Sequence, residues 1–199
     1  MRPRWIFLAL GMLACFPAEA FAHVDRQAGA GFLSGLLHPV FGLDHFLAML
    51  SVGIVSAQLG GKKVFIIPAV FVLSMVGGAV AGLQGQAWPL SEAGIALSVV
   101  VLGAAIALVR ENGGGWGVMP VVMFFGSLHG HAHGLELPQS ADPVYYAAGF
   151  VTSTTLIHLL GVGIGHGLTR HARYDPLLRH MGSVMAGMGL MILLRSVAS

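Results

Sequence analysis

The sequence predicts an all-α integral membrane protein in which a cleaved N-terminal signal peptide is followed by six transmembrane helices. Of its 199 residues, 56% are hydrophobic and only 9% are charged, whereas soluble domains carry about 25% charged residues. Six apolar segments follow the N-terminal one, and each approaches or exceeds the roughly 20 residues that a helix needs to span a bilayer. Because the connections between them are short and polar, residues 23–199 are expected to form one membrane domain. No run of Lys or Arg indicates nucleic acid as a partner.

Residues 1–22 have the three parts of a secretory signal peptide. MRPR is basic, residues 5–16 form an apolar run, and the small-residue sequence AFA ends at Ala22. We expect cleavage after Ala22, which leaves His23 outside the cytoplasmic membrane. Two alternatives are lipoprotein processing at Cys15 and retention of the segment as an uncleaved helix. Because Cys15 is the only cysteine, a metal site in the mature chain is expected to use nitrogen and oxygen ligands.

The positions of Lys and Arg orient the apolar segments. If His23 is outside, six alternating spans leave six of these residues on the cytoplasmic side and two, Arg26 and Arg195, on the periplasmic side. This excess obeys the positive-inside rule, so both ends of the mature chain are expected in the periplasm, at the inner membrane of a bacterium. Six spans would also divide into two halves of opposite orientation, a common transporter architecture. The expected spans are Ala28–Leu59, Val64–Leu83, Leu90–Val109, Val118–Leu137, Val144–Leu168 and Leu177–Val197.

The first span contains the sequence HPVFGLDH, from His38 to His45. Pro39 lacks a backbone N–H and disfavours helix at the residue before it, and Gly42 weakens the next turn. We therefore expect a broken helix that faces protein or a water-filled cavity, because lipid would not satisfy the freed backbone groups. The break would also decide where Asp44 points.

The fourth span contains SLHGHAHGLE, which places three histidines and a carboxylate within eight residues. His129, His133 and Glu136 are spaced i, i+4, i+7 and should form one stripe on a helix. His131 should point to the opposite side. A second stripe of small residues would let another helix approach closely. Its members are Gly126, Gly130 and Gly134.

Both motifs are expected at the same depth, in the periplasmic half of the bilayer. Ionisable groups in a membrane cost about 2.5–3.5 kcal/mol each on insertion scales, so several of them at one level need a compensating partner. A divalent cation would offset the two carboxylates, and imidazoles would complete its coordination shell, as they do for nickel, copper, zinc and iron. The predicted metal ligands are His38, Asp44, His45, His129, His133 and Glu136.

The other histidines and the methionines of the last span have different interpretations. His131, and His158 in the middle of the fifth span, could support the site or relay an ion, with packing as the alternative for each. Three histidines near the cytoplasmic side are interpreted as solvated: His166, His171 and His180. Four methionines of the last span are interpreted as flexible packing rather than as copper(I) ligands. They are Met181, Met185, Met188 and Met191.

The two motifs resemble those of the HupE/UreJ family. HPVFGLDH is similar to the family's H-x5-D-H motif, and LHGHAHGLE is similar to F-H-G-x-A-x-G-x-E, which it matches from His129 to Glu136. Leu128 stands where the family has Phe, but that position is not a ligand. The resemblance extends over the whole chain. It implies a nickel permease tied to hydrogenase or urease maturation, with cobalt as a second candidate substrate.

From the residues and this resemblance, we expect a permease that moves nickel from periplasm to cytoplasm and is not an enzyme. The transported ion would be its substrate, with no further cofactor, and metallochaperones of hydrogenase or urease maturation would be partners. The residues themselves leave two alternatives. One is an intramembrane metal-dependent hydrolase with a zinc-bound water, and the other is a haem-binding membrane subunit with axial histidines.

Overall fold

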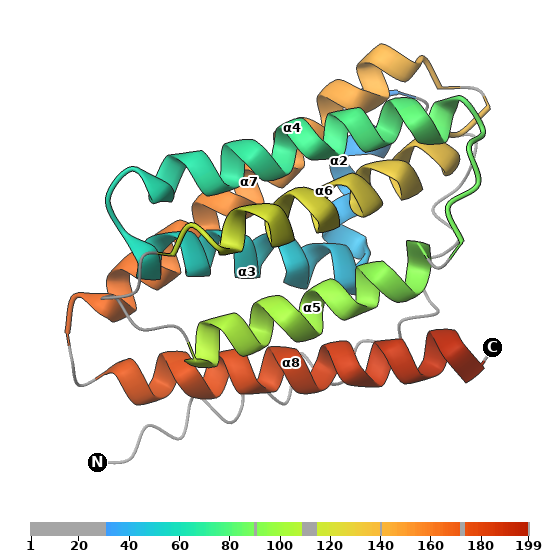
Figure 1. The fold of residues 1–199 in the computed structure, drawn as a ribbon. Coiled ribbons are helices and arrows are strands. Elements are labelled where there is room, and N and C mark those ends of the chain that lie inside the picture. The colour runs from blue at the N-terminus through green and yellow to red at the C-terminus, as the bar shows by residue number, and fades with distance from the viewer. Residues whose placement is uncertain (1–30, 90, 109–114, 140, 172–173, 199) are drawn as a thin grey trace.

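The protein is all-helical throughout the residues that the computed structural model describes, which are 31–89, 91–108, 115–139, 141–171 and 174–198 (Figure 1). The signal peptide and cleavage site expected over residues 1–22, and His23 after them, lie outside the described residues. The helices within the described ranges are α2 (Phe32–Phe41), α3 (Leu43–Leu59), α4 (Lys63–Leu83), α5 (Ser91–Leu108), α6 (Val118–Leu135), α7 (Pro143–Thr169) and α8 (Asp175–Ala198).

Four of the described helices, α4, α5, α7 and α8, are long and apolar enough to cross a bilayer. The bent pair α2 and α3 adds a fifth span if the two helices cross the membrane together. Helix α6 is not among these spans, because three histidines lower the mean hydropathy of its 18 residues. The prediction of an all-α membrane protein is therefore confirmed at the level of its class, and the count of six spans stays a prediction.

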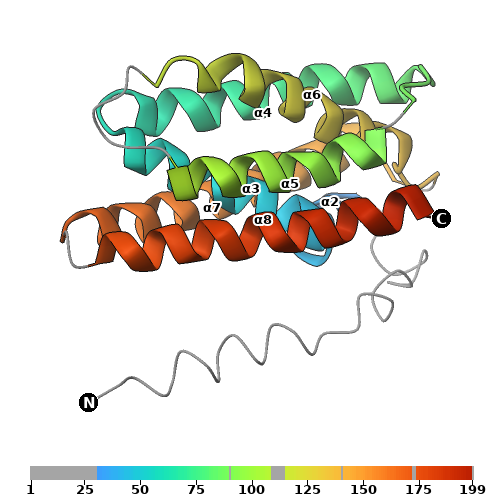
Figure 2. The ribbon, with the colours of Figure 1, turned by 60° about the horizontal axis from the view of Figure 1, so that its bottom comes forward.

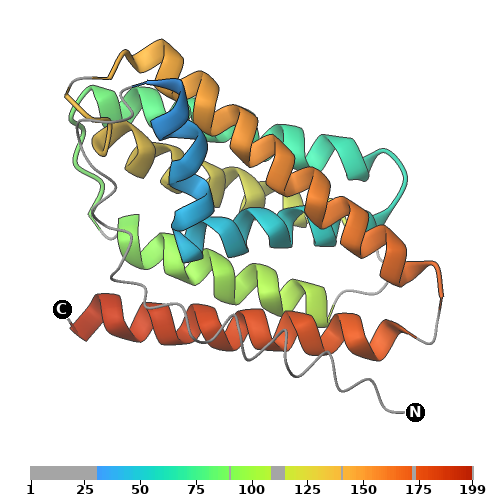
Figure 3. The same cartoon turned by 180° about the vertical axis from the view of Figure 1, so that it is seen from behind.

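The break predicted in the first span is present, but it lies later in the motif than expected. Helix α2 continues through His38 and Pro39 to Phe41, and α3 leaves at an angle of 82° (Figure 3). The break falls at Gly42, whose backbone is extended. A side chain there would meet His45 Nδ1 at 3.2 Å. Gly42, rather than the proline, thus provides the room in which the start of α3 turns.

The helices associate in three main pairs, which are α3 with α7, α4 with α6, and α5 with α8. Glycines let the backbones touch: Gly130 of α6 lies against the Met75 carbonyl of α4, and Gly53 of α3 lies against the His158 carbonyl of α7. The small-residue stripe predicted on α6 is confirmed, and its partner is α4. Helices α4 and α6 lie along one side of the molecule and α8 along the other, with α3 and α5 between them (Figure 2).

This pairing is the one that two inverted halves would give. Exchanging α3 with α6, α4 with α7, and α5 with α8 converts the pair α3–α7 into α6–α4 and leaves α5–α8 as it is. The exchange also places the two motif-bearing helices, α3 and α6, in equivalent positions. Helix α3 is the central one, and most of its side chains are buried in the main hydrophobic core. The functional motif at its start is therefore held by the best-packed part of the molecule.

Candidate metal centre

The break between α2 and α3 brings two histidines of the first motif together. His38 lies in the last turn of α2, and His45 lies in the first turn of α3. Their ring centroids are 5.6 Å apart, and the rings are nearly perpendicular. In a straight helix, residues seven apart would lie two turns, or about 10 Å, from each other along the axis. The bend is what converts this sequence spacing into a contact.

Helix α6 adds the histidines of its predicted stripe to the same place. The ring centroid of His133 is 4.8 Å from that of His38 and 5.0 Å from that of His45. One turn earlier on α6, the ring of His129 is 4.8 Å from the ring of His45. The two motifs, about ninety residues apart in the sequence, thus meet in one cluster of four imidazoles.

Three of these rings could hold one metal ion. His38, His45 and His133 each offer a ring nitrogen, and these nitrogens all lie within 4.8 Å of one another. An ion bonded at about 2 Å to each nitrogen would hold them no more than about 4 Å apart. The cluster is therefore slightly wider than an occupied site, and small side-chain movements would close it around an ion.

The two carboxylates of the motifs lie behind histidines rather than among the three nitrogens. Asp44 Oδ1 accepts hydrogen bonds from Nδ1 and from the backbone N–H of His45, each at 2.8 Å. Glu136 Oε2 lies 2.9 Å from His38 Nε2. Because a carboxylate only accepts, it fixes the proton on the nitrogen that it faces and leaves the other nitrogen with its lone pair. Histidines that bind metals are commonly oriented by carboxylates in this way.

His129 is arranged in the same manner by a hydroxyl group. The Ser98 hydroxyl donates to the Ile95 carbonyl at 2.6 Å, so its oxygen can accept from His129 Nε2, which lies 3.0 Å away. Nδ1 of His129 then carries the lone pair, and it is buried without a hydrogen-bond partner within the described part of the chain. A serine of α5 therefore orients this imidazole, which the sequence motifs did not indicate.

The free nitrogens are the strongest sign that the cluster takes a ligand. Across the described residues, buried ring nitrogens lacking a hydrogen-bond partner include Nε2 of His45 and both nitrogens of His133. The His133 ring stacks on Phe150 at 4.8 Å between centroids, which holds it in place without bonding it. Each unsatisfied buried polar group costs about 1–3 kcal/mol, so several at one point favour a partner from outside the chain.

His131 lies on the opposite face of α6, as its position in the sequence predicted. Its Nε2 is 2.6 Å from the Gln86 carbonyl, its Nδ1 is 3.1 Å from the Ser91 hydroxyl, and its ring stacks on Trp88. His158 is buried in α7 against Phe71, with ring centroids 5.2 Å apart. Among the described residues, no hydrogen-bond partner reaches either ring nitrogen of His158. His166, His171 and His180 are exposed.

Two further residues beside the cluster were not found from the sequence. Glu92 is an acidic residue in the first turn of α5, the helix whose Ser98 bonds His129. Tyr146 of α7 has its ring 6.4 Å from that of His38. Neither residue belongs to a spaced motif, and only the tertiary arrangement brings them here. In the sequence, the feature that could have pointed to Glu92 is its position as a carboxylate at the start of an apolar segment.

The fold and the cluster together define a multi-pass membrane protein with histidines positioned to hold a metal ion among its helices. The chain belongs to the HupE/UreJ protein family, whose model matches residues 10–192. It is 45% identical over 148 residues to Protein HupE of Rhizobium leguminosarum bv. viciae, which covers 74% of this chain and 76% of the relative. No solved structure matches the chain. The family resemblance inferred from the two motifs is thus confirmed.

Proposed function

We propose that this protein is a nickel permease that carries the ion from the periplasm to the cytoplasm and supplies hydrogenase or urease maturation, with cobalt as an alternative substrate. The observation that carries the proposal is the convergence of four imidazoles from two motifs, three of them buried, with ring nitrogens that have no hydrogen-bond partner among the described residues. Membership in the HupE/UreJ family supports it. Imidazole nitrogen is a suitable donor for nickel and cobalt.

The residues of the two motifs would have different roles in binding the ion. His38, His45 and His133 would hold the ion directly, and His129, one turn earlier on α6, would accept it next. Asp44 and Glu136, each in contact with a histidine, would offset the charge of a divalent ion and orient the imidazoles. His131 would hold α6 in place, and His158 would receive the ion deeper in the protein.

A gradient of exposure supports loading from one end of the bundle. The side chains of His38 and Glu136 are 30% and 46% exposed, whereas His129 is fully buried. An ion would therefore reach His38 and Glu136 first. With both ends of the mature chain in the periplasm, this end of the bundle is the periplasmic one. Reporter fusions would test that orientation: a periplasmic reporter should be active after Gln86 and inactive after Lys63.

The proposal differs from the two alternatives in what an experiment would detect. A haem would have to separate imidazole rings that now contact one another, and it would give a visible absorption spectrum. A hydrolase would require an open coordination position for water, and it would not need to release its metal. The free ring nitrogens would serve the metal of a hydrolase equally well, so membership in the HupE/UreJ family is what favours the permease over that alternative.

The decisive experiment is uptake of labelled nickel by cells that lack their own nickel transporters and express this chain alone. We expect uptake above that of cells that express the His45→Ala variant at the same membrane abundance. Unlabelled nickel and cobalt should compete, whereas magnesium should not. Equal uptake by the two kinds of cell, with the protein present in the membrane, would refute the permease function.

A further inference from the structure

Two buried methionine sulfurs lie one helical turn away from the histidine cluster. Met49 follows His45 by four residues on α3, and Met75 comes from the facing helix α4; both are fully buried. Both sulfurs contact the same group, the Thr154 hydroxyl of α7, at 3.3 Å for Met49 and 3.8 Å for Met75. Three helices therefore place two thioethers and one hydroxyl around a common point.

This group occupies the level between His133 and His158, beside the end of the cluster that His129 forms. Thr154 lies one turn after Phe150, which stacks on His133 in the cluster, and one turn before His158. On α3, the same step of four residues leads from His45 through Met49 to Gly53, which packs against the His158 carbonyl. The methionine pair thus stands about 6 Å, one turn of helix, from each neighbouring level.

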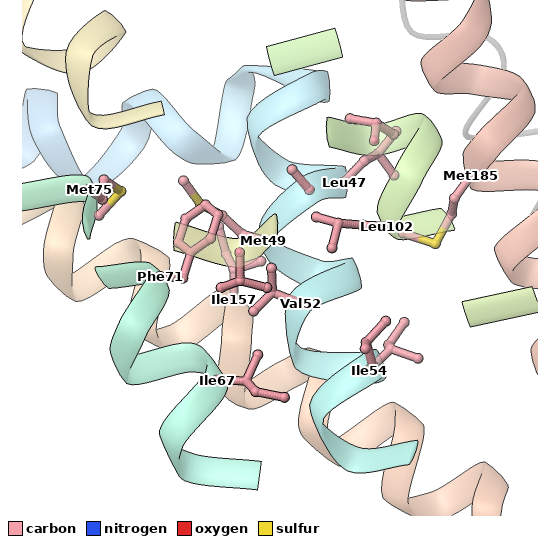
Figure 4. Packing of buried hydrophobic residues seen from close by; sticks show 14 of the residues in the cluster. Leu47, Met49, Val52, Ile54, Ile67, Phe71, Met75, Leu102, Ile157 and Met185 are labelled. Carbon is pink, nitrogen blue, oxygen red and sulfur yellow. The ribbon is translucent and has the colours of Figure 1, made fainter. Parts of the chain in front are cut away.

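On helix α4, which packs against α6, a similar step of one turn leads from Met75 toward His158. Phe71 lies one turn from Met75, and its ring contacts both His129, at 5.5 Å between centroids, and His158, at 5.2 Å. Met49, Phe71 and Met75 belong to one hydrophobic cluster, and in Figure 4 all three appear on the same side of α3. His158 is buried, and its two ring nitrogens have no hydrogen-bond partner in the described ranges. A polar group so placed indicates that something polar reaches this depth.

We propose that Met49, Met75 and Thr154 form a transit site through which the ion passes from the histidine cluster to His158. This inference rests on the proposed permease function. The Thr154 hydroxyl, which now donates to sulfur, would turn its oxygen toward the ion, and both thioethers would add soft donor atoms. Thioethers bind borderline and soft ions but offer little to magnesium or calcium, which take oxygen ligands. The site would therefore also reject hard cations.

Weak ligands suit a transit position. Conduction requires binding that is strong enough for an ion to enter and weak enough for it to leave. Two thioethers and a neutral hydroxyl give a weaker site than the imidazoles before it and the imidazole after it. The ion would thus be exchanged between histidines rather than trapped.

The methionine that provides a matched control lies on the other side of α3. Met185 of α8 is also buried, and its sulfur also accepts a hydroxyl hydrogen bond, from Ser51 at 3.8 Å. It packs beside Leu102, away from Met49 and Phe71 (Figure 4). Its environment matches that of the proposed ligands in burial and in bonding, but it belongs to α8, which pairs mainly with α5 rather than with the helices that carry the histidine cluster.

The test compares Met→Leu changes, which nearly conserve side-chain volume. Met49→Leu combined with Met75→Leu should slow nickel uptake about tenfold, the change that about 1.4 kcal/mol of lost stabilisation in transit produces. Equilibrium binding of nickel to the purified protein in detergent should stay within about twofold of wild type, because the histidine cluster is intact. Met185→Leu should alter neither quantity.

Each outcome separates the two proposals. If the wild-type protein binds no nickel and drives no uptake, the permease function fails. If wild type transports nickel and the double variant does so equally well at equal abundance, the transit site alone is refuted. A loss of binding as large as the loss of uptake would also refute it, by placing the methionines in the first binding site. Should the double variant not accumulate, Thr154→Val must slow uptake and Thr154→Ser must not.

Discussion

The two faces of α6 carry histidines in opposite situations. On one face, His131 uses both ring nitrogens, one toward Gln86 and the other toward Ser91, and lies flat on Trp88. On the other face, within the described residues, His133 has no hydrogen-bond partner at either nitrogen. Both side chains are buried to the same extent. The two histidines are therefore equally buried, and they differ in whether their ring nitrogens have hydrogen-bond partners.

This difference distinguishes a histidine that stabilises the fold from one that is free to bind a ligand. The partners of His131 come from the connection between α4 and α5 (Gln86 and Trp88) and from the first residue of α5 (Ser91), so the ring joins this connection to α6. The neighbours of His133 are two other imidazoles and a phenylalanine ring. None of these neighbours removes the cost of its unbonded nitrogens. A metal ion would, and mutations on the two faces should consequently have different effects.

The largest effect is expected from removing a histidine of the cluster. His45→Ala or His133→Ala should lower nickel uptake at least about a hundredfold, because loss of a group that merely orients a ligand already costs about 10–100-fold. Membrane abundance should change little. Labelled-nickel uptake, normalised to abundance, measures this effect. His171→Ala and His180→Ala, at exposed positions, are the controls and should match wild type.

A double change tests whether the two motifs share one ion. His45→Ala with His133→Ala should reduce uptake little more than either single change, because ligands of one ion act as a unit. The measurement is a double-mutant cycle in the same uptake assay. Residual uptake equal to the product of the two single effects would mean that each motif binds its own ion.

The stripe on α6 could be predicted from sequence because helical periodicity is local. Spacing alone assigned His133 and Glu136 to one face and His131 to the other. The bend was predicted only in part: proline chemistry suggested a break at His38, whereas the room needed beside His45 places it at Gly42. Helical periodicity thus predicts on which face of a helix a side chain lies, but it does not predict how far that side chain is from residues of other helices.

The partners that distinguish the histidines could not be predicted, because they are distant in sequence. Ser91 meets His131 across forty positions, and Met49 meets Thr154 across 105. The regular spacing of methionines marks the last span, where Met185 packs in the core, whereas Met49 of α3 and Met75 of α4 belong to no such pattern. The serines, the methionines of α3 and α4, and Glu92 belong to no regularly spaced motif. Only the packing of the helices therefore reveals which of these residues lie near the cluster.

A smaller effect is expected from the hydrogen bond between His129 and the Ser98 hydroxyl. Ser98→Ala removes the acceptor of His129 Nε2–H and leaves a second nitrogen of that ring without a partner. The affinity for nickel should fall about tenfold, the lower end of the range for groups that orient a metal ligand. Calorimetric titration of the purified protein measures it. Ser98→Thr keeps the hydroxyl and should restore most of the affinity.

The smallest effect on uptake is expected from His131, although it lies between two histidines of the cluster in the sequence. His131→Ala removes two hydrogen bonds and the stacking on Trp88, so it should lower the free energy of unfolding by about 2–4 kcal/mol. Uptake per molecule that reaches the membrane should stay within about twofold of wild type, because no ligand nitrogen is lost. Thermal unfolding in detergent, followed by tryptophan fluorescence, measures the first quantity. His131→Gln, which can still donate to the Gln86 carbonyl, should be less destabilised. An abundant and stable His131→Ala protein without uptake would place His131 on the path of the ion, and the two faces of α6 would no longer differ in function.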